Sequence, residues 1–282
     1  MAEILAMSRS SLRRLLFRPR FWVSLLLALG CVLIVFFKVP PYLSERGYQL
    51  QAAEPFLILF PSFFPQILLL ISFLLLVGDV PFLYPGMEIT AIRSSRQKWL
   101  AAQILAAMAA AVLWLLFLLA CTVLVFLGHI SFPNEWSIFL KALARSPGAM
   151  ESVGMGLADV PTTHLFEGTS PYARFGWMFL FQLLLLWSMA LWSLAFNLWT
   201  RRSYGCMITV SFWVLRRVVK ELAMTTQKDY SFLSPMSLVD LNQKTLTQER
   251  IIYIALFFLL QIAVLWILSA LRIKREDLSK AG

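Results

Sequence analysis

Long apolar runs separated by short polar segments dominate this chain of 282 residues. A helix that crosses the hydrocarbon core of a bilayer needs about 20 mostly apolar residues, and about six runs reach or approach that length. We therefore predict six membrane-spanning helices, over residues 21–37, 56–77, 99–127, 175–200, 206–224 and 251–271. The fold class that this pattern predicts is all-α, a polytopic bundle of transmembrane helices.

The composition excludes an ordinary soluble domain. Hydrophobic residues make up 60% of the chain and charged residues 14%, whereas soluble domains contain about 45–50% and about 25% respectively. So large an apolar surplus cannot be covered by a water-facing surface. The chain is therefore predicted to be an integral membrane protein, and the composition excludes most soluble enzymes and DNA-binding domains.

The net charge of +10 is distributed unevenly along the chain. If the N-terminus is cytoplasmic, the segments on that side are 1–20, 78–98, 201–205 and 272–282. These segments hold 14 of the 25 basic residues but 5 of the 15 acidic residues. Because cytoplasmic loops retain Lys and Arg, the distribution predicts that both termini are cytoplasmic. It also explains the charge without a nucleic-acid partner.

Residues 1–20 form a predicted amphipathic helix that ends near Pro19, because proline breaks a helix interior. One side gathers Ile4, Leu5, Leu12, Leu15 and Leu16, and another gathers Arg9, Arg13 and Arg20. The basic residues assigned to the membrane surface are Arg9, Arg13, Arg14 and Arg18. Such a helix lies in the inner headgroup layer, where it either anchors the topology or acts as an elbow that docks a cytoplasmic partner.

The second predicted span contains two prolines, Pro61 and Pro65, four residues apart. Each removes a backbone donor and clashes with the carbonyl four residues earlier, so the outer half of the span is expected to bend. The bend is either a hinge that lines a cavity or a static kink held by neighbouring helices.

The third predicted span is rich in alanine, with Ala102, Ala106 and Ala110 on one face. Small residues at this spacing let helix backbones approach closely. The span is therefore expected to carry a packing seam, within the subunit or between two copies. In the loop that follows, residues 135–145 are expected to form a short interfacial helix.

The fifth predicted span changes character along its length. At about 1.5 Å per residue, Arg216 lies about 17 Å beyond Gly205, just past the middle of a core about 30 Å thick. The charged residues of its outer half are Arg216, Arg217, Lys220 and Glu221. Cations that face lipid are costly, although Arg217 and Glu221 can pair.

Two structures for this fifth segment follow from that cost. It is either a short span whose upper part lines a wet vestibule or a re-entrant element. Its cations either receive an anionic group, such as a phospholipid head or an acidic peptide, or snorkel to outer lipid phosphates.

Catalytic and metal-binding patterns are missing from the sequence. There is no GxxxxGK[ST] phosphate-binding loop, no GxSxG, no HExxH and no pair of glutamates within a span. Cys31, Cys121 and Cys206 fall in apolar runs, which indicates packing. His129 and His164 lack partners at metal-ligand spacing. We expect no enzymatic activity, metal or cofactor in this chain itself.

The layout resembles the membrane subunits of type-2 ATP-binding-cassette (ABC) transporters over essentially the whole chain. The shared features are the basic N-terminal elbow, a coupling-type segment around Met87–Trp99, the large loop after the third span, and the irregular apolar region through Tyr230–Pro235. The stretch from Ala91 to Trp99 is similar to the basic, Trp-ended start of the third span in many bacterial members. The charged fifth span departs from the family.

The resemblance implies a permease subunit that pairs with a second, identical or different permease subunit. A separate P-loop ATPase would bind ATP and Mg²⁺, and a coupling helix and the elbow would transmit its closure. The domains would be the elbow (1–20), the six-span permease (21–277) and a cytoplasmic tail (278–282). The expected location is the bacterial cytoplasmic membrane, and the expected substrate is amphipathic, lipid-like or peptide.

Site residues follow from the same resemblance. The expected ATPase contact comprises Met87, Glu88, Ile89, Arg93 and Arg96, and the expected pathway comprises Gln66, Gln182, Arg216, Arg217, Lys220 and Glu221. A competing hypothesis is a non-transporting anchor, sensor or assembly factor. An ion-coupled carrier would need an acid relay, for which the spans offer little beyond Glu221.

Overall fold

The computed structural model describes residues 1–60, 62–82, 95–146, 153, 155, 162–166, 168–200, 204–228, 230–241 and 246–275. Its α-helices are α1 (Ala2–Leu16), α2 (Pro19–Phe36), α3 (Val39–Arg46), α4 (Glu54–Leu59), α5 (Phe63–Val77), α7 (Arg96–Val125), α8 (Ile138–Arg145), α10 (Pro171–Thr200), α11 (Gly205–Thr226), α12 (Pro235–Leu238) and α13 (Gln248–Arg275). Short 3₁₀ helices are η1 (Thr163–Leu165) and η2 (Ser231–Leu233), and the strands β1 (Leu50–Gln51) and β2 (Ile130–Ser131) pair in parallel.

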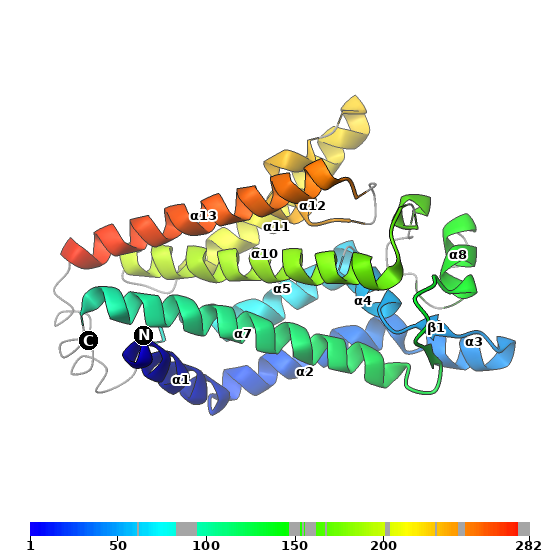
Figure 1. The fold of residues 1–282 in the computed structure, drawn as a ribbon, viewed down its shortest axis with the longest axis horizontal. Coiled ribbons are helices and arrows are strands. Elements are labelled where there is room, and N and C mark those ends of the chain that lie inside the picture. The colour runs from blue at the N-terminus through cyan, green and yellow to red at the C-terminus, as the bar shows by residue number, and fades with distance from the viewer. Residues whose placement is uncertain are drawn as a thin grey trace.

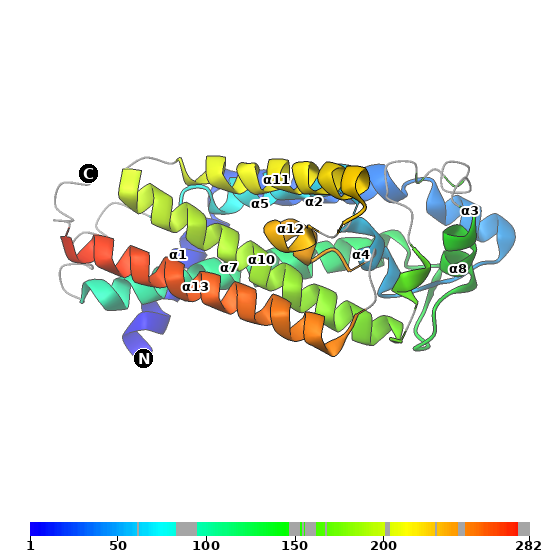
Figure 2. The ribbon, with the colours of Figure 1, turned by 90° about the horizontal axis from the view of Figure 1, so that it is seen from above.

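The long helices form an elongated bundle (Figure 1). Helices α2, α5, α7, α10 and α13 run broadly along its longest axis in both of the perpendicular views, whereas α11 is tilted away from that axis in Figure 1 (Figures 1 and 2). Helix α1 and the C-terminal end of α13 lie at one end of the bundle, which we call the terminal end. Helices α3 and α8 and strand β1 lie at the opposite end, which we call the loop end.

Four helices within the described residues are long and apolar enough to cross a membrane, which indicates a membrane protein. They are Pro19–Arg46 (α2 with α3), Arg96–Val125, Pro171–Thr200 and Gln248–Ile273. Many of their side chains face outward: Leu260 is 68% exposed, Leu256 61% and Ile267 59%. A continuous exposed apolar face of this kind is stable in lipid rather than in water.

The predicted second span is two helices rather than one bent helix. Helix α4 ends at Leu59, and α5 begins at Phe63 after Ser62, whose backbone is extended. Pro65 sits in the first turn of α5, where a missing N–H leaves no intrahelical bond unmade. Pro61 lies outside the described residues. With 15 residues, the apolar helix α5 is shorter than the four candidate spans.

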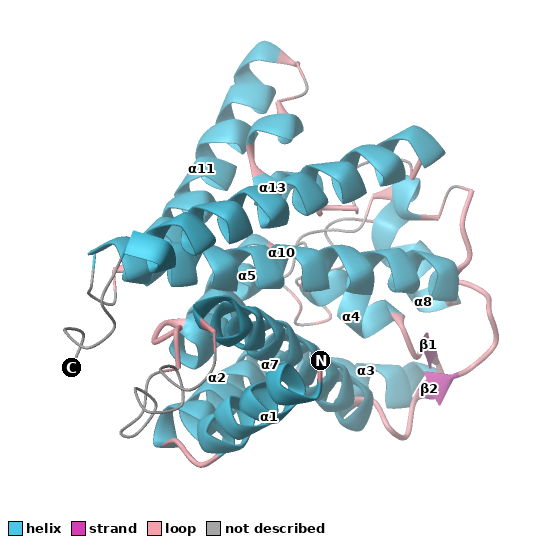
Figure 3. Ribbon diagram, turned by 60° about the vertical axis from the view of Figure 1, so that its left-hand side comes forward, coloured by secondary structure: helices cyan, strands magenta, loops and turns pink. Residues whose placement is uncertain are grey.

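The predicted fifth span is one continuous helix, α11, of 22 residues. The chain therefore does not turn back within residues 206–224. The chain turns back only after Gln227, whose φ of 55° is left-handed, and α12 then packs between α11 and α10 (Figure 2). Toward its C-terminal end, α11 rises away from α13 (Figure 3).

The first helix ends at Leu16, and the chain restarts as α2 at Pro19, a favoured residue in a first helical turn. Helix α1 packs on α7 through the buried face of Ser8, Ser11 and Leu15. The predicted apolar side is only partly used, because Leu5 is 53% exposed. Small serine side chains allow the two helices to approach closely.

Small polar and alanine side chains also join the other helices. Ser24 of α2 and Ser72 of α5 each donate a 2.7 Å hydrogen bond to the other residue's carbonyl, and Trp114 Nε1 donates to Ser72 Oγ at 3.0 Å. The alanine face of α7 is fully buried within the chain at Ala102 and Ala106. The packing seam predicted there therefore lies within the subunit.

Candidate functional site

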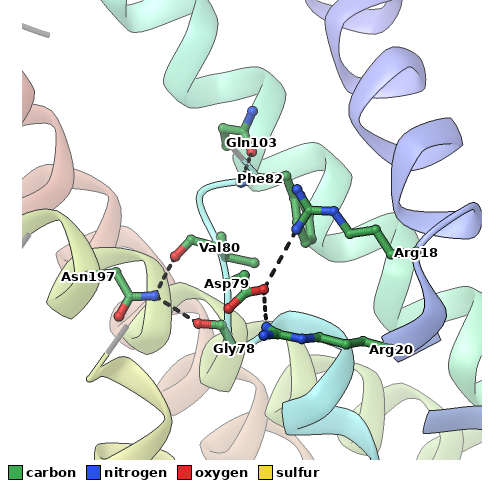
Figure 4. A network of polar contacts seen from close by, with 8 residues as sticks. All are labelled: Arg18, Arg20, Gly78, Asp79, Val80, Phe82, Gln103 and Asn197. Carbon is green, nitrogen blue, oxygen red and sulfur yellow. Dashed lines mark hydrogen bonds and ion pairs between the residues drawn. The ribbon is translucent and has the colours of Figure 1, made fainter. Parts of the chain in front are cut away.

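Residues Gly78–Phe82 leave the end of α5 at the terminal end and lead into the predicted coupling loop. Within that loop, Met87, Glu88, Ile89 and Arg93 lie outside the described residues. The two flanks of the loop, Gly78–Phe82 and the start of α7, are described in full. Both are bonded to other helices, and we take this terminal-end network as the candidate site (Figure 4).

Asn197, near the end of α10, is the residue that contacts the most backbone in this network. Its side-chain amide Nδ2 donates to the carbonyls of Gly78 at 3.0 Å and Val80 at 2.6 Å. Its Oδ1 accepts from the N–H of Gly205, the first residue of α11, at 2.8 Å. Figure 4 shows the two bonds to Gly78 and Val80. One amide with 8% exposure therefore joins the ends of α5 and α10 to the start of α11.

Asp79 ties the same segment to the junction of α1 and α2. Its carboxylate contacts Arg20 directly and Arg18 Nη1 at 3.7 Å. All three side chains are at least one-third exposed, so salt and water screen the attraction and each pair contributes little to stability. These ion pairs hold the Gly78–Phe82 segment near the junction of α1 and α2, although they add little to the free energy of unfolding.

Gln103 of α7 makes the third attachment. Its Oε1 accepts from the N–H of Phe82 at 3.0 Å, and its Nε2 donates to Ser11 Oγ on α1 at 3.4 Å. Gln103 is 1% exposed. A buried amide with both ends bonded fixes the backbone at Phe82, because breaking either bond would strand a buried polar group.

The far flank of the loop is attached as well. Ser95 caps α7 by accepting from Lys98 N–H at 3.3 Å. Arg96 Nη1 donates to the carbonyl of Ile273 on α13 at 3.3 Å, and Lys98 Nζ contacts Glu3 of α1 at 2.7 Å. Lys98 holds the pKa of Glu3 below its ordinary value. The two flanks of residues 83–94 are therefore bonded to α1, α7, α10 and α13, and Asn197 joins this network to α11.

A second polar cluster lies within the bundle and contains two of the predicted pathway residues. Arg216 of α11 is 3% exposed. It donates to Gln66 Oε1 on α5, and its Nη2 lies 3.2 Å from Asp240 Oδ2. A buried cation is stable only when it is paired and hydrogen-bonded, and both conditions are met here.

Gln66 and Gln182 line one small cavity together with Trp114 and Met236. The cavity volume is about 20 Å³, which is enough for a water molecule but not for a lipid or a peptide. The remaining predicted pathway residues point elsewhere. Arg217 and Glu221 are about half exposed and pair at 2.5 Å, as their four-residue spacing predicts, and Lys220 is half-buried.

Four residues of these clusters were not predicted from the sequence as site residues: Asp79, Gln103, Asn197 and Asp240. Two signals pointed toward them. An amide near the end of a long apolar run needs a partner, and an arginine inside a span needs an anion. Neither signal identifies the partner, because the contacts join segments far apart in the sequence.

At the loop end, Glu54 is fully buried and docks the segment after α7 onto α4. Its Oε1 accepts from Ser137 N–H at 2.7 Å, and its Oε2 accepts from Gln51 N–H at 3.1 Å. Ser137 in turn caps α8, whose observed start at Ile138 falls within the predicted 135–145 helix. Burial raises the pKa of Glu54 to about 7, against an opposing effect of the bonds from Ser137 and Gln51.

This raised pKa predicts a pH-dependent stability. The folded protein binds the proton on Glu54 more tightly than the unfolded chain, whose ordinary value is 4.5. The stabilisation is therefore complete below about pH 4.5 and is lost as the pH rises through about 7. We expect the melting temperature to fall between pH 5 and pH 8, and Glu54→Gln to reduce that fall. Glu45→Gln, at an exposed position, should keep the wild-type profile. Identical profiles for all three proteins would contradict the assignment.

No protein-family model, curated protein or solved structure matches the chain. Among the described residues, no group of three or more His, Cys, Asp or Glu side chains is placed to hold a metal ion. Function therefore has to be inferred from the residues and their arrangement.

Proposed function

We propose that this chain is the transmembrane permease subunit of an ATP-driven ABC transporter of the type-2 class. In this proposal it exports an amphipathic, lipid-like or peptide substrate across the bacterial cytoplasmic membrane. A separate P-loop ATPase carries ATP and Mg²⁺, and a second permease subunit completes the pathway. The chain itself supplies no catalytic group.

The attachment of both flanks of the 83–94 loop is the observation that carries this proposal. Gly78–Phe82 is bonded to three other parts of the bundle, and Arg96 and Lys98 are bonded to two more. A loop that only connects two helices needs no such attachments. A loop that receives force from a partner needs them, because a displacement reaches the helices only through packed and bonded contacts.

The proposed topology has six spans with both termini in the cytoplasm. Helices α5 and α11 are the two crossings added to the four apolar ones. The position of α1 and the end of α13 at the same end of the bundle supports an even number of crossings (Figure 1). The excess of basic residues in segments 1–20, 78–98, 201–205 and 272–282 supports a cytoplasmic location for that end.

Co-purification tests the proposal. The detergent-solubilised chain, expressed in its native host, is expected to retain a protein with a P-loop sequence, identified by mass spectrometry and by ATP hydrolysis. Arg93→Glu combined with Arg96→Glu should reduce the recovered ATPase about tenfold or more, because charge reversal penalises a docked interface.

The matched control reverses two exposed arginines at the loop end, Arg46→Glu with Arg145→Glu. This variant should recover as much ATPase as the wild type. If the Arg93/Arg96 variant recovers as much ATPase as the wild type, the assignment of this loop as the ATPase contact is wrong. Absence of any P-loop protein from the wild-type preparation would favour a non-transporting anchor, sensor or assembly factor.

A further inference from the structure

Helix α11 packs against the bundle with one side and leaves the opposite side exposed. Its buried residues are Gly205, Thr209, Arg216 and Val219. At about 100° per residue these four lie on one side of the helix, and α11 packs there against α10, α12 and α5. Helix α11 lies along one edge of the bundle in Figure 2 and rises away from α13 in Figure 3. Its other side is therefore open along most of the helix.

The open side of α11 carries side chains spaced alternately three and four residues apart. Met207, Val210 and Val214 are 68%, 44% and 50% exposed. Arg217 and Glu221 continue the series, and about half of each side chain is exposed. Alternating steps of three and four residues line the contact face of a helix that packs along a second helix. We call these five residues the α11 stripe.

The two charges of the α11 stripe lie at a depth where lipid would surround them. At about 1.5 Å per residue, Arg217 lies about 18 Å and Glu221 about 24 Å along the helix from Gly205, within a hydrocarbon core about 30 Å thick. Their 2.5 Å ion pair uses only part of the hydrogen-bonding capacity of a guanidinium and a carboxylate. Hydrocarbon offers no partner for the rest, whereas a protein surface with an acid and a base at the same depth would.

A second copy of this chain is a partner whose charges match. The charge distribution gives every copy the same orientation in the membrane, so the two-fold axis of a dimer runs along the membrane normal and makes the two α11 helices parallel. Each stripe residue then faces its own equivalent, and Arg217 of one copy lies one helical turn from Glu221 of the other. Each carboxylate can accept from the arginines of both chains, and polar residues of this kind fix the register of paired helices.

We propose that the α11 stripe is the contact through which two copies of this chain pair in the membrane. Val210 and Val214 pack against the same residues of the partner copy, and Arg217 and Glu221 form a network of four charges across the two-fold axis. As the identity of the second permease subunit, this pairing rests on the proposed function. As a contact between two copies it requires no ATPase.

Disulfide cross-linking in native membranes tests whether the two stripes lie together. In a background with Cys31, Cys121 and Cys206 replaced by alanine, Val214→Cys should form a cross-linked dimer on oxidation with copper phenanthroline. Its yield should exceed that of Leu260→Cys about tenfold or more, because a disulfide requires Cα atoms within about 7 Å. Leu260 is the matched control, since it is 68% exposed on α13 and outside the stripe.

Two cross-linking results would overturn the proposal. One is an equal yield from Val214→Cys and Leu260→Cys. The other is a cross-link from Val214→Cys to a different polypeptide, identified by mass spectrometry, which would make the partner of the stripe another protein.

Charge reversal tests whether Arg217 and Glu221 pair between copies rather than only within one helix. Two differently tagged copies that both carry Arg217→Glu have only acids in the stripe, and two that both carry Glu221→Arg have only bases. Either pair should co-purify about tenfold less than the wild type, because like charges then face each other. One copy of each variant places acids opposite bases, and co-purification should return to within about twofold of the wild type. Neither variant keeps the pair within its own helix, so this recovery would come from the contact between copies.

Arg145→Glu, a charge reversal at an exposed position of the loop end, should leave co-purification at the wild-type value. The proposal would be overturned by wild-type recovery of the Arg217→Glu pair, or by a mixed pair that recovers no better than either variant alone. The cross-linking assay retains both charges, so it decides the question even if the charge variants do not fold.

Neither assay depends on an ATPase, so their outcome is independent of the search for a P-loop partner. Cross-linked copies without an associated ATPase would leave the interface standing and reject the permease function. An associated ATPase without cross-linking at Val214→Cys would do the reverse.

Discussion

Replacement of Gly205 by alanine is expected to destabilise the protein by about 3 kcal/mol or more, at the upper end of overpacking effects. A Cβ at this position would lie 2.4 Å from Ser193 Cα and 2.5 Å from the Ser193 carbonyl oxygen. Both atoms belong to the backbone of α10, so no side-chain rotation relieves the clash. Helices α10 and α11 would have to separate where Asn197 binds them together. A thermal melt of the detergent-solubilised protein should show a fall of about 6–12 °C.

Gly176→Ala is the matched control for this substitution. Gly176 lies in α10, the helix against which Gly205 packs, and an added Cβ meets nothing within 4 Å. Because glycine in a helix interior costs about 0.5–1 kcal/mol relative to alanine, this variant should melt at the wild-type temperature or slightly above it. If Gly205→Ala has the same melting temperature as Gly176→Ala, the close crossing of α10 and α11 is wrong.

The elements that could be predicted from the sequence are those set by local patterns. Long apolar runs predicted α2, α7, α10 and α13 because the bilayer imposes their length and composition. Local chemistry also predicted the pairing of Arg217 with Glu221, four residues apart on one helix face. The alanines of α7 are also four residues apart on one helix face, and small side chains at that spacing predicted a close helix contact.

The elements that escaped prediction depend on contacts between distant segments. The hydropathy of residues 56–77 is continuous, yet the chain breaks into α4 and α5 because Ser62 is extended and bonds back to the Ile58 carbonyl. The charges of α11 predicted either a short span that lines a wet vestibule or a re-entrant element. The structure pairs Arg216 with Asp240, 24 residues later in a segment with no periodicity. No local pattern identifies that partner.

The same limit applies to the terminal-end network. Asp79 and Asn197 are 118 residues apart in sequence, and each is unremarkable in its own segment. Their roles appear only when the end of α5 lies against the end of α10 (Figure 4). The predicted coupling residues were placed on the loop itself, whereas the described contacts lie on its flanks. A partner would bind the loop, but the flanks would carry its motion into the bundle.

Asn197→Ala is therefore expected to separate partner binding from transport. The substitution leaves the carbonyls of Gly78 and Val80 and the N–H of Gly205 without their side-chain partner, at a cost of about 1–3 kcal/mol for each group that stays dry. The amino-acid sequence of residues 83–94 stays the same in this variant. The co-purified ATPase should be retained, while transport in reconstituted vesicles should fall about tenfold or more, since the flank no longer moves α10 and α11 together.

Asn197→Asp tests whether transport depends on donation to the Gly78 and Val80 carbonyls or on acceptance from the Gly205 N–H. An aspartate can still accept from Gly205, but its ionised carboxylate places negative charge against the carbonyl oxygens of Gly78 and Val80. If donation to these carbonyls positions the loop, Asn197→Asp should transport no better than Asn197→Ala at pH 8. It should recover in part at pH 5, where a protonated carboxyl group can donate one bond. Ser188→Ala removes a hydroxyl that, among the described residues, donates to the Leu185 carbonyl of its own helix, and this variant should behave as wild type. Full activity of Asn197→Asp at pH 8 would show that the bond to Gly205 alone suffices, and the flank would then not be the route by which the loop acts on the helices.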